Sequence, residues 1–422
     1  MYEIVDKRKG NIYMKNEERN EIQNLQQVNQ PYDYLIVGGG MVAAYAVQGI
    51  REYDKMGSIG VVSTDMDVPY TRPALTKKLW TDDEFTQDQV PLDTEENGVE
   101  LKLETAVTEI NRDQKTVRLD DGSILSYDKL LLATGSEPIE IEGPDDDRAI
   151  FFRSWEDYRK LRAYSGNNNH IIVVGGGYIG TELAAGLIQN ETRVTFVYPE
   201  EVLGEKQFPE EITKEYEQPF REVGVQMMNG KRAESYRKDG DKIIVTLDDG
   251  QEIEGDALVS GLGVSPRTDL AEGSGLKVDD GVIVDQYLRT SDPNIYAAGD
   301  IATYPDEILG SNRIEHVDHA RNSGETVGKV MAGSDEPYTY TPYFYSVVFD
   351  ISWKAIGTLD SELETMIDEV GEGKVVYYLK DNKPAGILLW NVEADLDEVR
   401  SILDNPPSDP SQLKGAIQEK ED

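Results

Sequence analysis

Two stretches of the chain repeat one pattern of apolar and small residues. Each begins with a short apolar run, continues with closely spaced glycines and ends in a second apolar run. The first reads YDYLIVGGG from Tyr32, and the second reads HIIVVGGGYIGTELAAGLI from His170. An apolar run that ends in glycines is typical of a buried parallel strand that turns directly into a helix. We therefore expect an α/β fold that contains this strand–turn–helix unit twice.

Other patterns predict smaller elements. The segment KIIVTLDDGQEIEGDALV (242–259) alternates apolar and polar residues around an Asp-Asp-Gly turn, which predicts a hairpin. After Pro337, the run VVYYLKDNKPAGILLW predicts another hairpin, and ADLDEVRSILDN predicts a helix. The segment EPIEIEGPDDD (137–147) is rich in proline and acid and predicts an exposed connector. We expect residues 1–30 to be a flexible extension and the polar residues 406–422 to be a frayed tail.

Cysteine is absent from the chain, and this excludes several kinds of chemistry. The 422 residues are enough for two or three domains with large cores. Without cysteine there can be no disulfide, no thiolate metal site and no cysteine nucleophile. The three histidines, His170, His316 and His319, are too few and too scattered for a metal cluster, so we predict no metal site.

The chain is strongly acidic, with 81 acidic and 42 basic residues and a net charge of −39. Such a surface repels nucleic acids and anionic membranes, so neither is an expected partner. In about 1 M salt the Debye length falls to about 3 Å, which would screen the self-repulsion. We interpret the charge as adaptation to a salty cytoplasm, and an ordinary acidic bacterial protein is the alternative because lysine is not scarce. The chain has no signal-like or membrane-spanning run, which favours a cytoplasmic protein.

The first glycine group has the spacing of a dinucleotide-binding turn. Gly38, Gly40 and Ala43 fit the pattern G-x-G-x-x-G/A. Glycine allows the sharp turn and the close approach of backbone to a pyrophosphate, and the following helix N-terminus offers N–H groups to the phosphates. Asp65, which follows IGVVST, is the candidate acid for the adenosine ribose. A tight strand–helix turn without a ligand is the alternative.

The second glycine group matches the pattern completely, with Gly175, Gly177 and Gly180. Glu200 follows about 20 residues after Gly180, where a ribose-binding acid is expected. A carboxylate there accepts hydrogen bonds from the ribose diol and repels a 2′-phosphate, which predicts NADH rather than NADPH. The last residue of the strand is Tyr198, however, so a solvated surface acid is the alternative interpretation of Glu200.

Two further strings support a protein that binds two dinucleotides. DKLLLATGS (128–136) precedes the connector, and NIYAAGDIA (294–302) comes late in the chain. In the second string, Gly299 permits close backbone approach and Asp300 can hydrogen-bond the ribityl or phosphate part of a flavin. Each string alone could be a strand that ends in a turn, but their order around the two glycine groups makes coincidence a poor explanation.

With these motifs the chain resembles the two-dinucleotide-binding-domain flavoproteins, the FAD/NAD(P)-dependent pyridine nucleotide oxidoreductases. It is most similar to the branch of apoptosis-inducing factor, the oxygenase-type ferredoxin and rubredoxin reductases, and monodehydroascorbate reductase. PYTRPALTKKLW (69–80) resembles the RP-P/A-LSK string of that branch. RIEHVDHARNSG (313–324) and PYFYSVVFDISW (342–353) resemble monodehydroascorbate reductase. Ferredoxin reductases usually carry tryptophan where this chain has Val317 and Tyr345, which disfavours a ferredoxin partner.

The resemblance implies two Rossmann-like domains and a smaller α+β domain that covers the flavin and is a candidate homodimer interface. The implied FAD-binding domain comprises residues 31–147 and 271–336, the inserted NAD(P)-binding domain residues 148–270, and the C-terminal domain residues 337–405.

The resemblance also assigns roles to residues. Lys77 and Glu182 would pair beside the flavin on its nicotinamide side, and Arg321 and Tyr345 would face the electron acceptor. An ion pair with no redox role is the alternative for Lys77 and Glu182. The catalytic residues are thus expected to be Lys77, Glu182, Arg321 and Tyr345. FAD is expected to contact Gly38, Gly40, Ala43, Asp65, Arg72, Lys77, Thr134, Gly135, Gly299, Asp300 and His316. NAD is expected to contact Gly175, Gly177, Tyr178, Ile179, Gly180, Glu182, Glu200 and Gly263.

The function implied is transfer of hydride from NADH to flavin N5, followed by direct transfer of electrons to an acceptor, because no cysteine is present. A small one-electron or quinone-type acceptor is our first hypothesis. A ferredoxin- or rubredoxin-type protein is the second. The third is a redox-responsive NADH-binding module like apoptosis-inducing factor.

Overall fold

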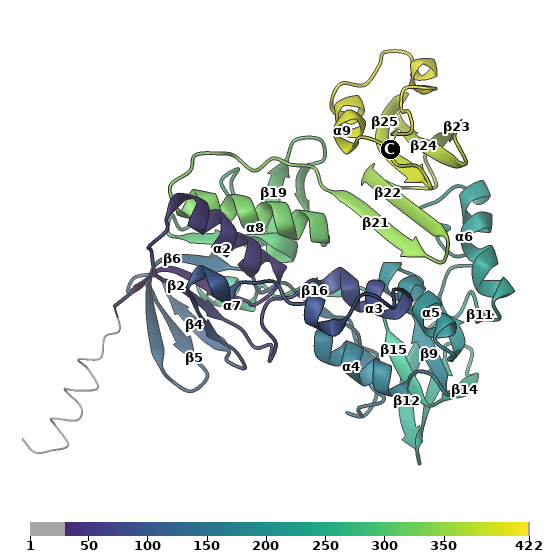
Figure 1. Ribbon diagram of the computed structural model, residues 1–422, viewed down its shortest axis with the longest axis horizontal. Coiled ribbons are helices and arrows are strands. Elements are labelled where there is room, and N and C mark those ends of the chain that lie inside the picture. Colours follow the sequence, from purple (N-terminus) through teal and green to yellow (C-terminus); the bar gives the residue numbers. More distant parts are fainter. Residues whose placement is uncertain (1–29, 421–422) are drawn as a thin grey trace, which may run out of the picture.

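The structure is a computed structural model that describes residues 30–420. The expected flexible extension, residues 1–30, therefore lies outside the described residues except for its last one. Figure 1 shows three parts: a first sheet beneath helices α2 and α8, a second sheet beside helix α5, and a C-terminal part with α9. No helix among the described residues is long and apolar enough to cross a membrane.

The first sheet is built around the first repeated strand. Its central strand pairs in parallel on both sides, and a short strand from far along the chain pairs in parallel with the same sheet. Its order is β3 (Val99–Lys102), β2 (Ile59–Val62), β1 (Tyr32–Val37), β6 (Ile124–Leu132), with β18 (Ile295–Ala297) also on β6, and antiparallel β5 (Thr116–Leu119) and β4 (Val107–Asn111) continuing from β6.

Helices α2 (Met41–Tyr53) and α8 (Val317–Met331) cover this sheet side by side (Figure 1). Small residues let their backbones approach closely. A Cβ atom on Gly49 would lie 2.1 Å from the carbonyl oxygen of Glu325, and one on Gly328 would lie 2.1 Å from that of Ala46. The helix that follows the first glycine turn is therefore held firmly in place.

The second sheet is entirely parallel and repeats the arrangement of the first. Its order is β11 (Gln226–Met228), β10 (Arg193–Val197), β9 (His170–Val174), β15 (Ala257–Ser260), β8 (Ala149–Phe151). Its helices are α4 (Trp155–Tyr164), α5 (Tyr178–Gln189) and α6 (Glu210–Glu222). The hairpin predicted over 242–259 is present as β13 (Lys242–Leu247) and β14 (Glu252–Gly255), beside β12 (Ala233–Asp239). Residues 257–260 leave the hairpin and join the parallel sheet, because all four are buried there.

The chain crosses between the two sheets twice, at β7 (Ser136–Pro138) and β16 (Val264–Pro266), which pair antiparallel. The connector 137–147 is mostly exposed, as predicted. The remaining short elements are α3 (Lys78–Thr81), α7 (Asp269–Gly273), β17 (Val282–Ile283), β19 (Ala302–Asp306), β20 (Gly310–Arg313), and the 3-10 turns η1 (Arg72–Leu75), η2 (Gln87–Gln89), η3 (Glu95–Asn97), η4 (Gly299–Ile301) and η5 (Pro410–Leu413).

The C-terminal part is an antiparallel sheet with one helix, α9 (Leu396–Asp404). Its order is β21 (Tyr343–Val348), β22 (Ile351–Gly357), β25 (Lys383–Trp390), β24 (Gly373–Lys380), β23 (Glu364–Val370). The predicted hairpin and helix are both present. The prediction of a frayed tail is wrong for residues 406–420, because Leu413 and Ile417 are fully buried in the core beneath this sheet.

The second sheet and the C-terminal sheet share one apolar core. Phe208 stacks edge-on against Trp353 with 5.5 Å between ring centroids, and Tyr216 does so against Trp390 at 5.7 Å. Aromatic pairs of this kind stabilise a contact by more than the burial of their apolar area alone would. The C-terminal sheet is therefore fixed to the second domain, and its edge strand β21 reaches the region between the two parallel sheets (Figure 1).

Candidate active site

A cavity of about 1670 Å³ lies between the two parallel-sheet domains, and both glycine turns line it. Ligands of such sheets bind outside the carboxyl ends of the strands, where these turns lie. Most of the residues predicted to form the site line this cavity. They are Gly38, Gly40, Asp65, Arg72, Lys77, Thr134, Gly135, Gly177, Tyr178, Ile179, Glu182, Gly263, Asp300, His316 and Tyr345.

Four other predicted positions lie behind the cavity wall and act in packing. Ala43 is fully buried in α2. A Cβ on Gly175 would lie 2.4 Å from the carbonyl oxygen of Gly261, and one on Gly180 would lie 1.8 Å from that of Gly175. At Gly299 a Cβ would lie 2.4 Å from a methyl group of Val42. These small residues bring helix and strand together, so we expect them to shape the turns without contacting a ligand.

The first turn has the form of an anion cradle. Gly38 has φ +116, and a Cβ there would lie 2.1 Å from the carbonyl oxygen of Ala133, so only glycine fits. Gly40 is the N-cap of α2, and no described side chain caps this helix. A Cβ on Gly40 would meet only the guanidinium of Arg72, 3.9 Å away. The free N–H groups of the first helical turn and this cation therefore face the same open space.

Two guanidinium groups and one carboxylate lie beside the first turn. Arg72 Nη1 donates to the carbonyl oxygen of Arg153 (2.9 Å), and Arg153 Nη2 donates to Asp300 Oδ2 (2.7 Å). Burial and the nearby charge of Arg153 lower the pKa of Arg72. Burial acts to raise the pKa of Asp300, but the charge and hydrogen bond of Arg153, together with the charge of Arg72, outweigh burial, and the pKa lies below its usual value. Arg153 Nε is buried without a hydrogen-bond partner among residues 30–420. The surplus positive charge and this orphan donor fit a pyrophosphate.

Arg153 was not among the residues predicted from the sequence. It lies just after β8 in the string FFRSW, and the only signal is a single arginine at the carboxyl end of a strand in the second domain. Asp65, by contrast, lies where it was expected. It lines the cavity and accepts a hydrogen bond from the Tyr70 hydroxyl (3.0 Å).

Lys77 and Glu182 meet where the three parts of the molecule join. Lys77 Nζ lies 2.8 Å from Glu182 Oε2, and the Glu182 side chain is only 1% exposed. The ammonium also lies 4.8 Å from the ring centroid of Tyr345. Two hydroxyl groups donate to the same carboxylate, Thr76 Oγ1 to Oε2 and Ser346 Oγ to Oε1, each at 2.6 Å. Neither hydroxyl was predicted, because small neutral residues carry no signal of their own.

His316 caps α8 and lines the cavity near Lys77. Its Nε2 lies 3.4 Å from the Tyr345 amide and its Nδ1 lies 3.5 Å from the Asp318 amide. A neutral imidazole has one acceptor nitrogen, so it can accept only one of these two bonds. Burial, and then the charge of Lys77, lower the pKa of His316 to about 3. His316 is therefore neutral at ordinary pH.

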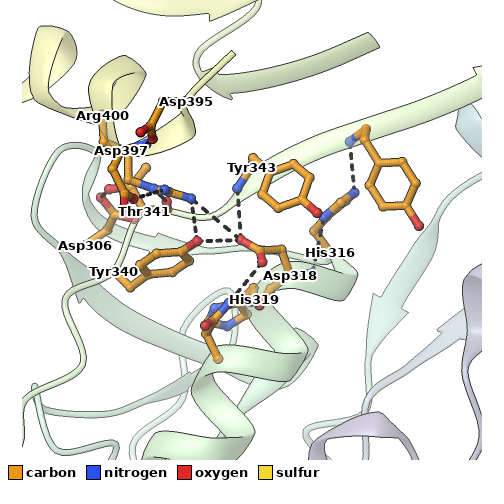
Figure 2. Close-up of polar contacts among 12 residues, drawn as sticks. Asp306, His316, Asp318, His319, Tyr340, Thr341, Tyr343, Asp395, Asp397 and Arg400 are labelled. Atoms are coloured by element: carbon orange, nitrogen blue, oxygen red, sulfur yellow. Dashed lines mark hydrogen bonds and ion pairs between the residues drawn. The ribbon is translucent and has the colours of Figure 1, made fainter. Parts of the chain in front are cut away.

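A polar network behind His316 ties α8 to the C-terminal part (Figure 2). Asp318 accepts hydrogen bonds from the Tyr340 hydroxyl (3.0 Å) and the Tyr343 amide (3.2 Å). Arg400 of α9 donates to the carbonyl oxygen of Thr341 (2.8 Å) and to the Tyr340 hydroxyl. This network fixes the start of β21, and thus the strand that carries Tyr345 and Ser346.

The second turn is more open than the first. Gly177 is the N-cap of α5, and a Cβ there would meet no heavy atom of the described chain within 4 Å. Glu200 lies beside this turn, with Oε2 3.4 Å from the position of a Cβ on Gly176, and Lys206 Nζ lies 2.7 Å from its Oε1. The Glu200 side chain is 17% exposed, so it is not a freely solvated acid. Tyr198 is buried and donates to Glu217 (3.1 Å), so it faces away from the cavity.

Arg321 is the catalytic candidate that the structure does not bring into this cavity. It is exposed on α8, and its guanidinium lies 5.6 Å from the ring centroid of Tyr45. If Arg321 contacts an electron acceptor, it does so on the outer surface of the molecule, outside this cavity.

Two parallel-sheet domains whose glycine turns share one cavity define a protein that holds two dinucleotides. The chain belongs to the pyridine nucleotide-disulphide oxidoreductase family, whose sequence model matches residues 32–324. Members of this family bind FAD and NAD(P)H, and the chain is an oxidoreductase of this kind. The resemblance and the fold class predicted from the sequence are thus confirmed.

The relatives that match this chain carry names with different functions. The chain is 30% identical to apoptosis-inducing factor 1, mitochondrial, of Dictyostelium discoideum, over 89% of this chain and 78% of that protein. It is 31% identical to monodehydroascorbate reductase of Solanum lycopersicum, over 85% of this chain and 90% of that protein. Its fold matches a chain of the covalent putidaredoxin reductase–putidaredoxin complex with TM-score 0.82 and 27% identity, covering 91% of this chain and 96% of that one.

Proposed function

We propose that this protein takes reducing equivalents from NADH through FAD and passes them directly to a small one-electron or quinone-type acceptor. The observation that carries the proposal is the Lys77–Glu182 pair, whose carboxylate is buried and which lies with Tyr345 and His316 in the cavity that both glycine turns line. The absence of cysteine supports direct transfer, because no dithiol relay can be formed.

FAD, when bound, supplies a ring that accepts hydride from a reduced nicotinamide and releases electrons singly or in pairs. The chain supplies binding and electrostatics. The N–H groups after Gly40, with Arg72 and Arg153, would hold the pyrophosphate, and Asp65 would hold the ribose. Lys77 would stabilise negative charge that develops on the ring, and Glu182 keeps that ammonium in place.

NADH is the proposed coenzyme because Glu200 lies beside the second turn. Its carboxylate would accept hydrogen bonds from a ribose diol and repel a 2′-phosphate. Lys206 offsets part of that repulsion, because its ammonium lies 2.7 Å from the same carboxylate. We therefore expect a moderate preference for NADH.

Two observations bear on the acceptor. The monodehydroascorbate reductases, at 31–32% identity in several plants, favour a small acceptor. The match to a putidaredoxin reductase complex, and to a ferredoxin reductase of Rhodopseudomonas palustris with TM-score 0.81 and 26% identity, favours a redox protein as the second candidate. The net charge of −39 disfavours an acidic protein partner unless salt is high.

Steady-state turnover with NADH and a panel of acceptors tests this proposal. Fast turnover with quinones or ferricyanide, without acceleration by ferredoxin or rubredoxin, is the expected result. Strong acceleration by either protein would favour the second candidate. Slow turnover with every acceptor, together with a persistent charge-transfer band, would favour a redox-responsive module like the relative named apoptosis-inducing factor.

A further inference from the structure

One carboxylate receives hydrogen bonds from three separate parts of the chain. Glu182 belongs to α5 of the second domain, Thr76 and Lys77 follow η1 in the segment that links β2 to β3, and Ser346 belongs to β21. Thr76, Glu182 and Ser346 are buried, with exposures of 4%, 2% and 0%. Hydrogen bonds to a buried charged group are the strong ones, so each hydroxyl affects how the carboxylate is held.

The three donors divide the two oxygens of Glu182 between them. Ser346 Oγ binds Oε1, whereas Lys77 Nζ and Thr76 Oγ1 bind Oε2. This division fixes the rotation of the carboxylate about its last bond. Without the Ser346 hydroxyl, Oε1 would be buried and free, and Lys77 would be drawn toward both oxygens. The ammonium would then leave its place 4.8 Å from the Tyr345 ring, at the cavity wall.

The position of β21 explains how one strand serves both partners. Tyr345 and Ser346 are consecutive, so their side chains leave opposite faces of the sheet. Both nevertheless contact the ion pair, Tyr345 at the lysine and Ser346 at the glutamate. Strand β21 is an edge strand of its sheet and packs against helix α5, which carries Glu182.

We propose that Ser346 is a positioning residue of the active site, which acts through Glu182 to set the place of the Lys77 ammonium. The C-terminal domain would thereby complete the site in which hydride transfer occurs. This inference rests on the function proposed above. A purely structural hydrogen bond is the competing explanation, and it would affect unfolding without affecting the rate of flavin reduction.

Stopped-flow reduction by NADH in Ser346→Ala, Lys77→Ala and the double variant separates these explanations. Ser346→Ala removes one hydrogen bond to a charged group. We therefore expect NADH to reduce the flavin of this variant about tenfold more slowly than that of the parent, with unchanged flavin content and coenzyme affinity. In the Lys77→Ala background the same substitution should have almost no further effect, because it acts through Lys77. Ser260→Ala is the matched control, since its hydroxyl is buried without a partner among the described residues.

Equal reduction rates in Ser346→Ala and the parent, or independent effects in the double variant, would overturn the inference. If Ser346→Ala does not fold, Thr76→Val and Thr76→Ser make the same test at Oε2. The valine variant should be slow and the serine variant should match the parent, and equal rates in both would count against positioning by hydroxyl groups. A parent protein that neither NADH nor NADPH reduces would instead refute the proposed function itself.

Discussion

The two glycine turns share one backbone device but differ in what surrounds them. Beside the first turn lie Arg72 and Arg153, with Asp300 as their counter-charge. In the second turn, a Cβ on Gly177 would meet no described heavy atom within 4 Å, and Glu200 is the nearby charge. The glycine turn alone therefore does not decide how a dinucleotide is held. A cationic turn suits a retained cofactor, whereas a more open turn beside an acidic side chain suits a coenzyme that exchanges.

Alanine at the first glycine of each turn should have the largest effect on cofactor and coenzyme binding. Gly38→Ala and Gly175→Ala both place a Cβ against a carbonyl oxygen, at 2.1 Å and 2.4 Å, in backbone with φ +116 and +106. We expect Gly38→Ala to lose FAD, and Gly175→Ala to keep FAD but to resist reduction by NADH. Absorbance spectra and reduction by dithionite check this. Retention of FAD by Gly38→Ala would contradict the assignment of the first turn.

Lys77→Ala should slow reduction by NADH about 100-fold while FAD remains bound, because the ammonium stabilises charge that appears only on reduction. Stopped-flow kinetics and potentiometry measure the two effects, and the flavin potential should fall. Lys78→Ala is the matched control, since Lys78 is exposed and lies near Phe85 instead. A parental rate and an unchanged potential in Lys77→Ala would make the ion pair structural only.

Acid should lower the free energy of unfolding, and residues near the first turn should contribute more to this loss than residues of the second domain. His319 is fully buried beside Tyr304, and burial lowers its pKa to about 4. The unfolded chain binds a proton near pH 6.5 and the folded chain does not. Stability from His319 is therefore complete above about pH 6.5 and is lost as pH falls toward 4, by about 3 kcal/mol.

Denaturant unfolding between pH 7 and pH 4 checks this prediction. His319→Gln should flatten the pH dependence of the free energy of unfolding, and His170→Gln, at a half-buried position in the second domain, should flatten it less. An equal slope in His319→Gln and the parent would show that this histidine is not held neutral.

Charge at the second turn should set coenzyme preference. Glu200→Gln should reduce the preference for NADH over NADPH about tenfold, and Lys206→Ala should increase it about threefold. These effects are modest because both charges are partly exposed. The ratio of kcat/KM for the two coenzymes measures both effects. Glu201→Gln is the control, because Glu201 is adjacent and exposed. If NADPH is already the better donor, Glu200 does not face the ribose.

Salt should have the smallest and most general effect. Molar KCl should raise the Tm by several degrees if the charge of −39 is a salt adaptation, because screening removes self-repulsion. Thermal melting at low and molar KCl measures it. A Tm that is unchanged or lowered would favour an ordinary acidic protein.

The repeated strand–glycine–helix units could be predicted because they are local patterns, and so could the pairing of Lys77 with Glu182 through family resemblance. Arg153, Thr76 and Ser346 could not, since their roles arise from contacts between parts of the chain distant in sequence. The buried tail was missed for a similar reason. Leu413 and Ile417 are isolated apolar residues in a polar segment, and only the core beneath the C-terminal sheet explains them.

An anaerobic titration of the purified protein with NADH, followed by absorbance, tests most directly whether the chain carries FAD and accepts electrons from NADH. We predict a yellow protein with about one non-covalently bound FAD per chain, whose flavin band bleaches as about one equivalent of NADH is added. A colourless protein that cannot be reconstituted with FAD would contradict both the FAD site and the proposed function.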